Sequence, residues 1–379
     1  MEPKNVTRTW RDRLRPAIFA VLTAVSIMGA SGARALDVFE VRGVETDVTA
    51  ENANEARTQA LATAERKAFE LMLKRLTLRS DWPRLPKAGE QGAAMFIRDF
   101  SVIREKASSV RYIASLAYRF KPDEIRALLR NYSIPFSETV SKPVLVLPIY
   151  REGGAFMLWD DPNPWREAWE NRPAVIGLVP TAMPLGDLAD IAAISVDQAL
   201  AGNAERLQAI ADRYGAGDVL VVLCTYQAPS GSTPAELQVT VSRFGRTAIY
   251  PTNVSSIPAE ADETLDSLLS RAALELTYRL EDEWKSENLI QLGDRQSLPA
   301  VIAISGLPDW LEVRRRLASV AIVEKVELLL LSRDEARVNL VYSGTPEQLS
   351  VALDQVDLGL LPTDTGWAIT SSQRGGTAR

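Results

Sequence analysis

Hydrophobic and polar positions recur with two different periods along the chain, and the changes of period predict its elements. In the first part, alternation of period two is typical of strands, whereas alanines spaced three and four residues apart are typical of one helix face. Small side chains on that face allow a helix to lie close on a sheet. We therefore predict a small α+β domain over residues 36–138. Its expected elements are a strand within 36–50, a helix over 51–77, a helix from Ala93 to Lys106, a strand over 110–120 and a helix over 121–132.

The middle of the chain alternates strand and helix patterns, which is typical of α/β units with parallel strand pairing. Two apolar runs flank Gly153 and Gly154, a spacing that favours a hairpin. We predict a central α/β domain over residues 143–290. Its further elements are a strand over 174–180, a helix over 203–214, a buried strand over 218–226, a hairpin within 236–251 and an amphipathic helix over 261–287.

The last part, residues 298–370, shows strand, helix, strand, strand, helix and strand patterns in that order. This βαββαβ order predicts a ferredoxin-like sandwich. Residues 371–379 are polar and rich in glycine and serine, so we predict a disordered tail. The fold class expected for the whole chain is therefore a multidomain combination of α+β and α/β units.

The N-terminus predicts a signal peptide over residues 1–35. A net positive segment precedes an apolar run over 17–30, which is shorter than the roughly 20 residues needed to cross a bilayer. Ala33, Arg34 and Ala35 then match the small-residue pattern that signal peptidase cleaves. We predict cleavage after Ala35 and a periplasmic location, with an uncleaved N-terminal anchor as the alternative.

Charge argues against two classes of partner. Residues 1–35 hold six of the 43 basic and two of the 49 acidic side chains, so the remaining chain has a formal net charge of −10. A surface of that sign repels phosphate backbones and anionic lipid headgroups. The basic run Arg314–Arg316 fits the solvated face of a helix. We predict no nucleic-acid partner and no stable membrane insertion after removal of the signal.

The inventory of reactive side chains is small. The chain has no histidine, which excludes imidazole bases, histidine triads and histidine-ligated zinc. The single cysteine, Cys224, lies in an apolar run and cannot form an intrachain disulfide. No phosphate-binding loop or metal motif is present, so no cofactor and no metal site are predicted. Pairs of carboxylates stay possible, because their pairing is spatial.

The most unusual stretch is residues 158–173, which holds three of the eight tryptophans. Asn163 and Pro164 suit the start of a helix, so two of these tryptophans lie four residues apart on one helix face. If exposed, they would form a recognition surface; if buried, they would complete the domain core. The candidate recognition surface comprises Trp159, Asp160, Asp161, Trp165 and Trp169.

A second acidic stretch follows at residues 184–200. Asp187, Asp190 and Asp197 are expected mainly at helix starts and turns, with a ligand-binding or catalytic role as the alternative.

Four long segments carry a resemblance to a known family. They are "VRGVETDVTAENANEARTQALATAERKAFELMLKRLT", "IASLAYRF" with "IRALLRNYSIPFSE", "PVLVLPIY", and "LADIAA" with "LQAIADRYGAGDVLVV". Together they resemble the exported proteobacterial family called domain of unknown function 2066, over most of residues 37–290. The resemblance implies an envelope location and assigns no catalytic role to any position.

Three hypotheses of function follow. The first is an exported, non-enzymatic periplasmic protein that serves assembly or maintenance of the cell envelope through contacts with envelope proteins. The second is a periplasmic binder of small ligands or peptides that uses the central domain, beyond its strand ends. The third is a carboxylate-dependent hydrolase, supported only by the abundance of Asp and Glu.

Overall fold

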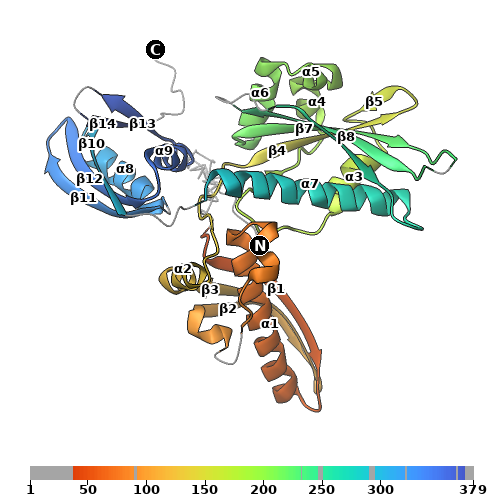
Figure 1. Cartoon of the computed structure of the whole chain (residues 1–379), viewed down its shortest axis with the longest axis horizontal. Coiled ribbons are helices and arrows are strands. Elements are labelled where there is room, and N and C mark those ends of the chain that lie inside the picture. The colour runs from red at the N-terminus through yellow and green to blue at the C-terminus, as the bar shows by residue number, and fades with distance from the viewer. Residues whose placement is uncertain are drawn as a thin grey trace, which may run out of the picture. The chain divides into compact units, whose positions relative to one another are not determined.

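The structure is a computed structural model, and three β-sheets with their covering helices organise it (Figure 1). The predicted signal peptide lies outside the described residues. The predicted tail does too, apart from Ser371, which ends a strand. Among the helices that are described, none is both long and apolar enough to span a membrane. The structure describes residues 37–88, 92–231, 233–245, 251–289, 295–320, 322–363 and 366–371.

The first sheet is antiparallel, with strand order β1-β3-β2, and α1 packs on one face. Helix α1 begins at the predicted cap, where the Asn52 side chain accepts a hydrogen bond from the amide of Glu55. The alanine stripe, which includes Ala56, Ala60 and Ala64, is fully buried, as predicted. The elements are β1 (Glu40–Thr49), α1 (Ala53–Leu76), the 3₁₀ turns η1 (Arg79–Arg84) and η2 (Ala93–Phe96), β2 (Ile97–Ala107), β3 (Arg111–Phe120) and α2 (Pro122–Asn131).

The predicted helix from Ala93 to Lys106 is wrong, because most of this segment is strand β2. The pairing of β2 with β3 shifts register between Ile97 and Asp99 and again between Val102 and Arg104. Each bulge adds a residue that breaks the alternation of period two, which left a pattern similar to that of a helix.

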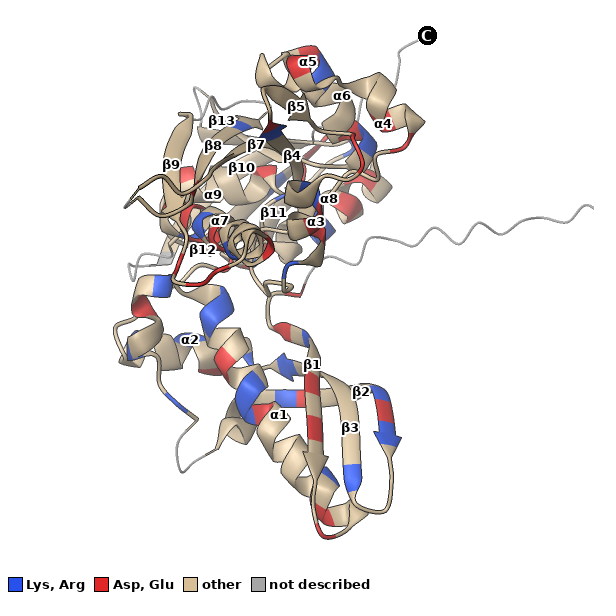
Figure 2. Ribbon diagram, turned by 90° about the vertical axis from the view of Figure 1, so that its right-hand side faces the viewer, with Lys and Arg blue, Asp and Glu red and all other residues tan. Residues whose placement is uncertain are grey.

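Charged side chains of both signs are interspersed along α1 and the strands of the first sheet (Figure 2). Arg111 forms two hydrogen bonds with the carboxylate of Asp47 across the sheet, at 2.6 and 2.8 Å. Arg119 donates to Asp99 at 2.6 Å. Such exposed pairs each stabilise a fold by only about 0–1 kcal/mol, so the buried side chains hold this sheet on α1.

The central sheet is mixed, with β4 and β7 parallel and β7, β8 and β9 antiparallel, in the order β5-β4-β7-β8-β9. The predicted hairpin between β4 and β5 is confirmed. The elements are β4 (Val144–Glu152), β5 (Ala155–Met157), α3 (Pro164–Asn171), β6 (Thr181–Ala182), α4 (Leu188–Ala193), α5 (Val196–Leu200), α6 (Ala204–Tyr214), β7 (Asp218–Gln227), β8 (Glu236–Gly245), β9 (Asn253–Pro258) and α7 (Leu265–Glu287).

Helices cover both faces of the central sheet, and consecutive strand residues are therefore buried on opposite faces (Figure 1). On one face Leu145 and Val219 belong to the same buried cluster as Leu207 of α6. On the other, Val146 and Val222 belong to a cluster that includes residues of α3 and α7. Burial on both faces explains why β4 and β7 are apolar almost throughout.

The strand predicted over 174–180 is wrong, because this segment is not a strand; the two residues that follow it, β6, pair in parallel with β4. The amides of Leu178 and Val179 donate to the buried carboxylate of Glu281 on α7, at 2.9 and 2.7 Å, instead of to a neighbouring strand. Gly177 lies against the same carboxylate, where a side chain would have no room. A contact distant in sequence thus replaces the strand.

The third sheet has the order β11-β12-β10-β14-β13. The predicted strands and helices are present in the predicted order, but β13 was not predicted, and the sheet therefore has one strand more than a ferredoxin-like sandwich. Strand β14 pairs in parallel with β10 and antiparallel with β13, and so lies between them. The elements are β10 (Arg295–Ala303), α8 (Leu307–Ser319), β11 (Val323–Leu331), β12 (Glu335–Ser343), α9 (Pro346–Asp354), β13 (Leu358–Thr363) and β14 (Gly366–Ser371).

Candidate functional site

The predicted tryptophan ridge on α3 is not a surface. The helix begins as expected, since the Asn163 side chain accepts a hydrogen bond from the amide of Arg166. Trp165 and Trp169 do share one face and meet edge to face, with ring centroids 5.8 Å apart. Both are fully buried. The exposed interpretation of these two residues is therefore wrong, because their face of α3 covers the central sheet.

The other three residues of the predicted recognition surface lie apart from this core. Trp159 is half-buried, and its indole N–H donates to the carbonyl of Ile194 at 2.9 Å. Asp160 and Asp161 are exposed in the turn that precedes α3. The five residues therefore do not form one surface. The contact of Trp159 with Ile194 joins the turn before α3 to the end of α4.

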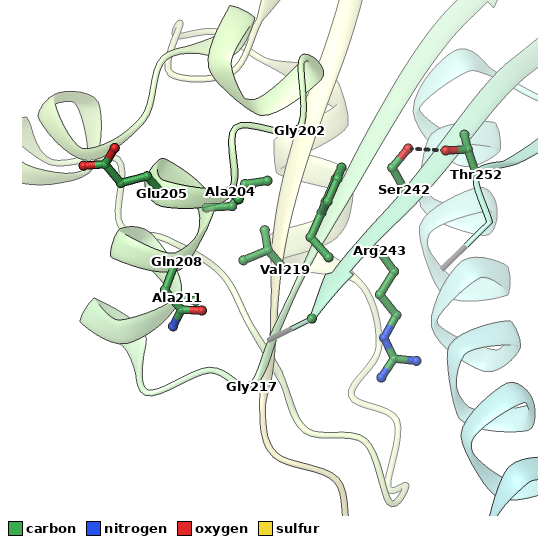
Figure 3. Close-up of a pocket in the computed structure, with 13 residues that line it drawn as sticks. Gly202, Ala204, Glu205, Gln208, Ala211, Gly217, Val219, Ser242, Arg243 and Thr252 are labelled. Atoms are coloured by element: carbon green, nitrogen blue, oxygen red, sulfur yellow. Dashed lines mark hydrogen bonds between the residues drawn. The ribbon is translucent and has the colours of Figure 1, made fainter. Parts of the chain in front are cut away.

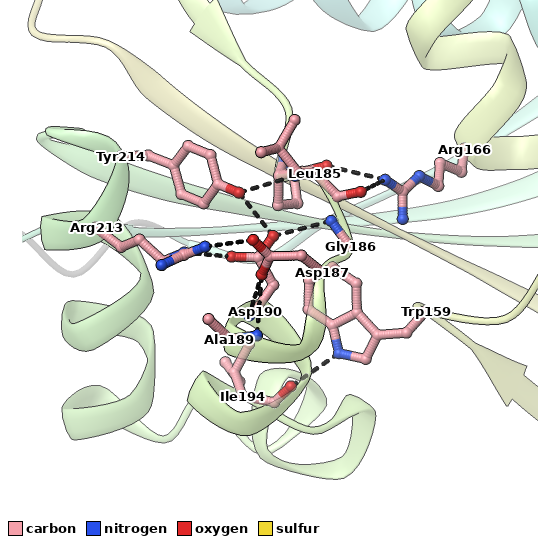
Figure 4. A network of polar contacts seen from close by, with 11 residues as sticks. Trp159, Arg166, Leu185, Gly186, Asp187, Ala189, Asp190, Ile194, Arg213 and Tyr214 are labelled. Carbon is pink, nitrogen blue, oxygen red and sulfur yellow. Dashed lines mark hydrogen bonds and ion pairs between the residues drawn. The ribbon is translucent and has the colours of Figure 1, made fainter. Parts of the chain in front are cut away.

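We call residues 184–191, which are the turn before α4 and the first four residues of that helix, the clamped loop, because side chains from two other helices hold its backbone (Figure 4). From α3, one terminal nitrogen of Arg166 donates to the carbonyls of Pro184 and Leu185, both at 2.9 Å. From the end of α6, the Tyr214 hydroxyl accepts a hydrogen bond from the amide of Leu185 at 2.8 Å. The loop is thus fixed to the domain on both sides.

Asp190 is the centre of this polar network (Figure 4) and is fully buried. Its carboxylate accepts hydrogen bonds from Tyr214 at 2.6 Å, from Arg213 at 2.7 Å and from the amide of Gly186 at 2.9 Å. Burial alone raises the pKa of Asp190, but these hydrogen bonds and the Arg213 charge outweigh it and hold that pKa below its ordinary value. Asp190 is therefore ionised at neutral pH, and its hydrogen bonds hold α4 and α6 together.

The neighbouring aspartates match the prediction for helix starts. Asp187 caps α4, where it accepts hydrogen bonds from the amides of Ala189 and Asp190, and it also accepts one from Arg213 at 2.6 Å. Asp197 lies in the first turn of α5. The sequence identified their local role but missed that Asp190 joins α4 to α6.

Three apolar side chains of the clamped loop face solvent. Leu188 is 85% exposed, Leu185 75% and Ile191 46%. Single exposed leucines are ordinary, but three within seven residues on a loop held by hydrogen bonds form a local apolar patch. Sequence reasoning missed this patch, because apolar residues near a helix start are normally assigned to the core.

Asp190→Asn is expected to lower the free energy of unfolding by about 1–3 kcal/mol at pH 7, because it weakens hydrogen bonds to a buried charge. Since the native pKa is depressed, the wild-type contribution is complete above the unfolded pKa of 3.8 and is lost as the pH falls through the native value. Urea unfolding at pH 7 and pH 3 measures this. A difference between the two proteins that does not shrink at pH 3 would contradict the assignment.

A cavity of about 660 Å³ lies between α6 and the paired ends of β7 and β8 (Figure 3). Its polar groups are largely satisfied: Arg243 donates to Asp218 at 2.7 Å, and the Ser242 and Thr252 hydroxyls lie 3.1 Å apart. It adjoins the amino-terminal end of β7. Its lining residues are Gly202, Ala204, Glu205, Leu207, Gln208, Ala211, Gly217, Val219, Ser242, Arg243, Phe244, Gly245 and Thr252.

Cys224 is buried in β7, as its apolar setting predicts. Burial raises the pKa of its thiol to about 12, so the thiolate needed for nucleophilic attack does not form near neutral pH. Within the described ranges, no group of three or more Cys, Asp or Glu side chains is arranged to hold a metal ion.

No protein-family model matches the chain. No curated protein shows significant similarity to it either. The resemblance to domain of unknown function 2066 therefore stays a prediction.

Proposed function

We propose that this protein is exported to the cell envelope and acts there by binding another protein, without catalysing a reaction, and that the clamped loop makes the contact. The observation that carries the proposal is the pairing of exposed leucines with a backbone fixed by buried polar groups. The proposal moves the recognition surface from the α3 tryptophans to the loop that α3 helps to hold.

The first argument is that the polar groups of this region serve structure. One carboxylate oxygen of Asp190 accepts a hydrogen bond from Arg213, and the other accepts one from Tyr214. Arg166 donates to backbone carbonyls of the clamped loop. A general base or a nucleophile needs a free lone pair directed at a substrate. The hydrogen bonds that the structure shows for these two side chains are all made inside the protein, which favours a structural role.

The second argument is that the loop is ordered before it binds. Ordering a flexible loop at an interface costs free energy that reduces affinity. Here the contacts of Arg166, Tyr214 and Asp190 supply that order in advance. Leu185 and Leu188 are consequently presented to a partner at little further entropic cost.

The third argument concerns the kind of partner. Two protruding leucines and a neighbouring isoleucine fit an apolar groove on another protein. A lipid surface is less compatible, because the chain without the predicted signal peptide has a formal net charge of −10 and envelope lipids with anionic headgroups repel such a protein. The partner we propose is therefore an envelope protein with an apolar groove.

The test compares crosslinked partners in intact cells at matched protein abundance. Leu185→Ser/Leu188→Ser is expected to reduce a defined crosslinked adduct at least tenfold, because it removes the apolar anchor. Val254→Ser on β9 is the matched control, since Val254 is also exposed, at 61%, and is expected to leave the adduct unchanged. An adduct retained by the double variant would contradict the proposal.

The double variant is expected to change the free energy of unfolding by less than about 0.5 kcal/mol, because both side chains are exposed. A urea titration therefore separates a loss of binding from a loss of folding.

The cavity beside α6 supports a second candidate function, the binding of a small ligand in the central domain. Its volume of about 660 Å³ lies within the range of small-molecule sites. A thermal-shift screen of periplasmic metabolites tests it, and a compound that stabilises the protein through this cavity would lose its effect in Ala204→Trp, which fills the cavity. A screen without a stabilising compound would count against this candidate.

A further inference from the structure

Exposed acidic side chains lie on the two segments that adjoin the clamped loop. Asp160 and Asp161 are exposed in the turn before α3, and Asp197 is exposed in the first turn of α5. Among the described residues, none of these three carboxylates has a hydrogen-bond or ion-pair partner. They therefore carry negative charge that the fold itself does not neutralise.

The turn that holds the first two aspartates is fixed next to the clamped loop on both of its sides (Figure 4). Trp159, directly before them, donates its indole N–H to the carbonyl of Ile194 at the end of α4, at 2.9 Å. Arg166, in the first turn of α3, donates to the carbonyls of Pro184 and Leu185. The turn is thus held in place by contacts with both ends of the segment that carries the apolar patch.

Asp197 is held close to the same contact from the other direction along the chain. Ser195, which directly follows Ile194, begins α5 with a capping box: its hydroxyl accepts a hydrogen bond from the amide of Gln198, and the Gln198 side chain accepts one from the amide of Ser195. These two bonds fix the first turn of α5 directly after α4. The acidic side chains therefore lie on both sides of the contact that ends at Ile194.

The basic side chains of this region are already paired inside the protein. Arg166 lies 2.8 Å from the carboxylate of Glu170, and Arg213 lies 2.7 Å from that of Asp190. Over residues 158–200 the chain has seven acidic and two basic side chains, a formal net charge of −5. The surroundings of the apolar patch are therefore acidic.

This charge indicates what covers the patch. We propose that the groove of the partner protein has a rim of lysine or arginine side chains, which face Asp160, Asp161 and Asp197 while its apolar floor receives Leu185 and Leu188. The inference rests on the proposed function and adds the chemistry of the partner's surface. Interfaces surround an apolar centre with a polar rim, and complementary charges on the two rims speed association and reject wrong partners.

The same charges argue against two other occupants of the patch. A second copy of this chain would place its own acidic side chains against these, and like charges that meet at an interface oppose association. Anionic lipid headgroups would meet the same repulsion. A protein with a basic rim instead complements both the apolar patch and its acidic surroundings.

The first test reverses the charge of the turn and measures the crosslinked adduct in intact cells, with a photoreactive amino acid at residue 188. Asp160→Arg/Asp161→Arg is expected to reduce the adduct at least about tenfold, because like charges then meet at the rim, and Asp160→Asn/Asp161→Asn about threefold, because only the attraction is lost. Glu124→Arg/Glu287→Arg is the matched control. It makes the same change of charge at exposed side chains of α2 and α7 and is expected to leave the adduct unchanged.

The outcomes separate this inference from the proposed function. A discrete adduct that the double variant of the turn reduces no more than the control variant does would overturn the basic rim and leave the proposed function standing. Absence of a discrete adduct in the otherwise wild-type protein would contradict the proposed function and this inference with it. Urea unfolding midpoints equal to that of the wild type show that a lost adduct reports a lost contact instead of a lost fold.

A second measurement varies salt and needs no change to the acidic residues. In envelope extracts the adduct is expected to fall at least about threefold between about 50 and about 500 mM NaCl, because salt screens exposed charges. Asp160→Asn/Asp161→Asn/Asp197→Asn is expected to remove this dependence on salt. An adduct that salt leaves unchanged or increases in the protein with all three aspartates would contradict the basic rim.

Discussion

Replacement of Trp165 by alanine is expected to lower the free energy of unfolding by about 3–5 kcal/mol, the range for a large aromatic side chain lost from a core. Trp165 is fully buried, packs against Trp169 and donates its indole N–H to the carbonyl of Val222 at 3.1 Å. Urea or guanidinium unfolding followed by circular dichroism measures the change. A loss below about 1 kcal/mol would mean that the residue lies at the surface after all.

The two tryptophans also provide a matched comparison. Trp169 is equally buried, but its indole nitrogen has no acceptor among the described residues. Trp165→Phe is therefore expected to lower the free energy of unfolding by about 1 kcal/mol more than Trp169→Phe does, because only the Trp165 variant loses a hydrogen bond. Asp160→Ala, in the exposed turn before α3, is expected to change stability by less than about 0.5 kcal/mol. Equal costs at the two tryptophans would contradict the hydrogen bond to Val222.

Glu281→Ala is expected to lower the free energy of unfolding by about 3–5 kcal/mol, the second large effect. The carboxylate of Glu281 is buried on α7, where it accepts the amides of Leu178 and Val179 and lies 3.6 Å from the ammonium group of Lys285. Removing it leaves two amides without their acceptor and a buried positive charge without its counterion. Burial already lowers the pKa of Lys285, and the Glu281 charge opposes this effect, so removing Glu281 further destabilises the charged form of Lys285.

Two variants sharpen this second prediction. Gly177→Ala is expected to destabilise the fold as well, because its Cβ would lie 2.0 Å from the Glu281 carboxylate, which has little room to move. Glu287→Ala, at the exposed end of the same helix, is the control and is expected to change stability by less than about 0.5 kcal/mol. Thermal or chemical unfolding of the three variants measures both effects. A Glu281→Ala protein as stable as the control would contradict the account.

Local patterns predicted the elements whose signal is contained in a few turns of chain. The alanine stripe of α1, the amphipathic pattern of α7 and the glycine pair before β5 all have the predicted structure. The i, i+4 spacing of Trp165 and Trp169 likewise placed both on one helix face. In each case the deciding contacts are within the element or its direct neighbour.

Predictions failed where distant residues decide the outcome. Strand β2 owes its conformation to pairing with β3 through two bulges, and the segment before β6 donates to Glu281, about 100 residues later in the chain. The clamped loop depends in the same way on Tyr214 and Arg213, which are 24 and 23 residues from Asp190. The spacing of residues along the chain does not show that such a network leaves the leucines of the clamped loop exposed to solvent.

The most direct test of the central claim is photo-crosslinking in intact cells from a photoreactive amino acid placed at residue 188, the most exposed position of the clamped loop. The proposed function predicts a discrete adduct with one envelope protein, absent when the same group replaces Val254 and strongly reduced when Arg213→Met loosens the loop. An adduct pattern at position 188 no different from that at position 254 would contradict recognition by this loop.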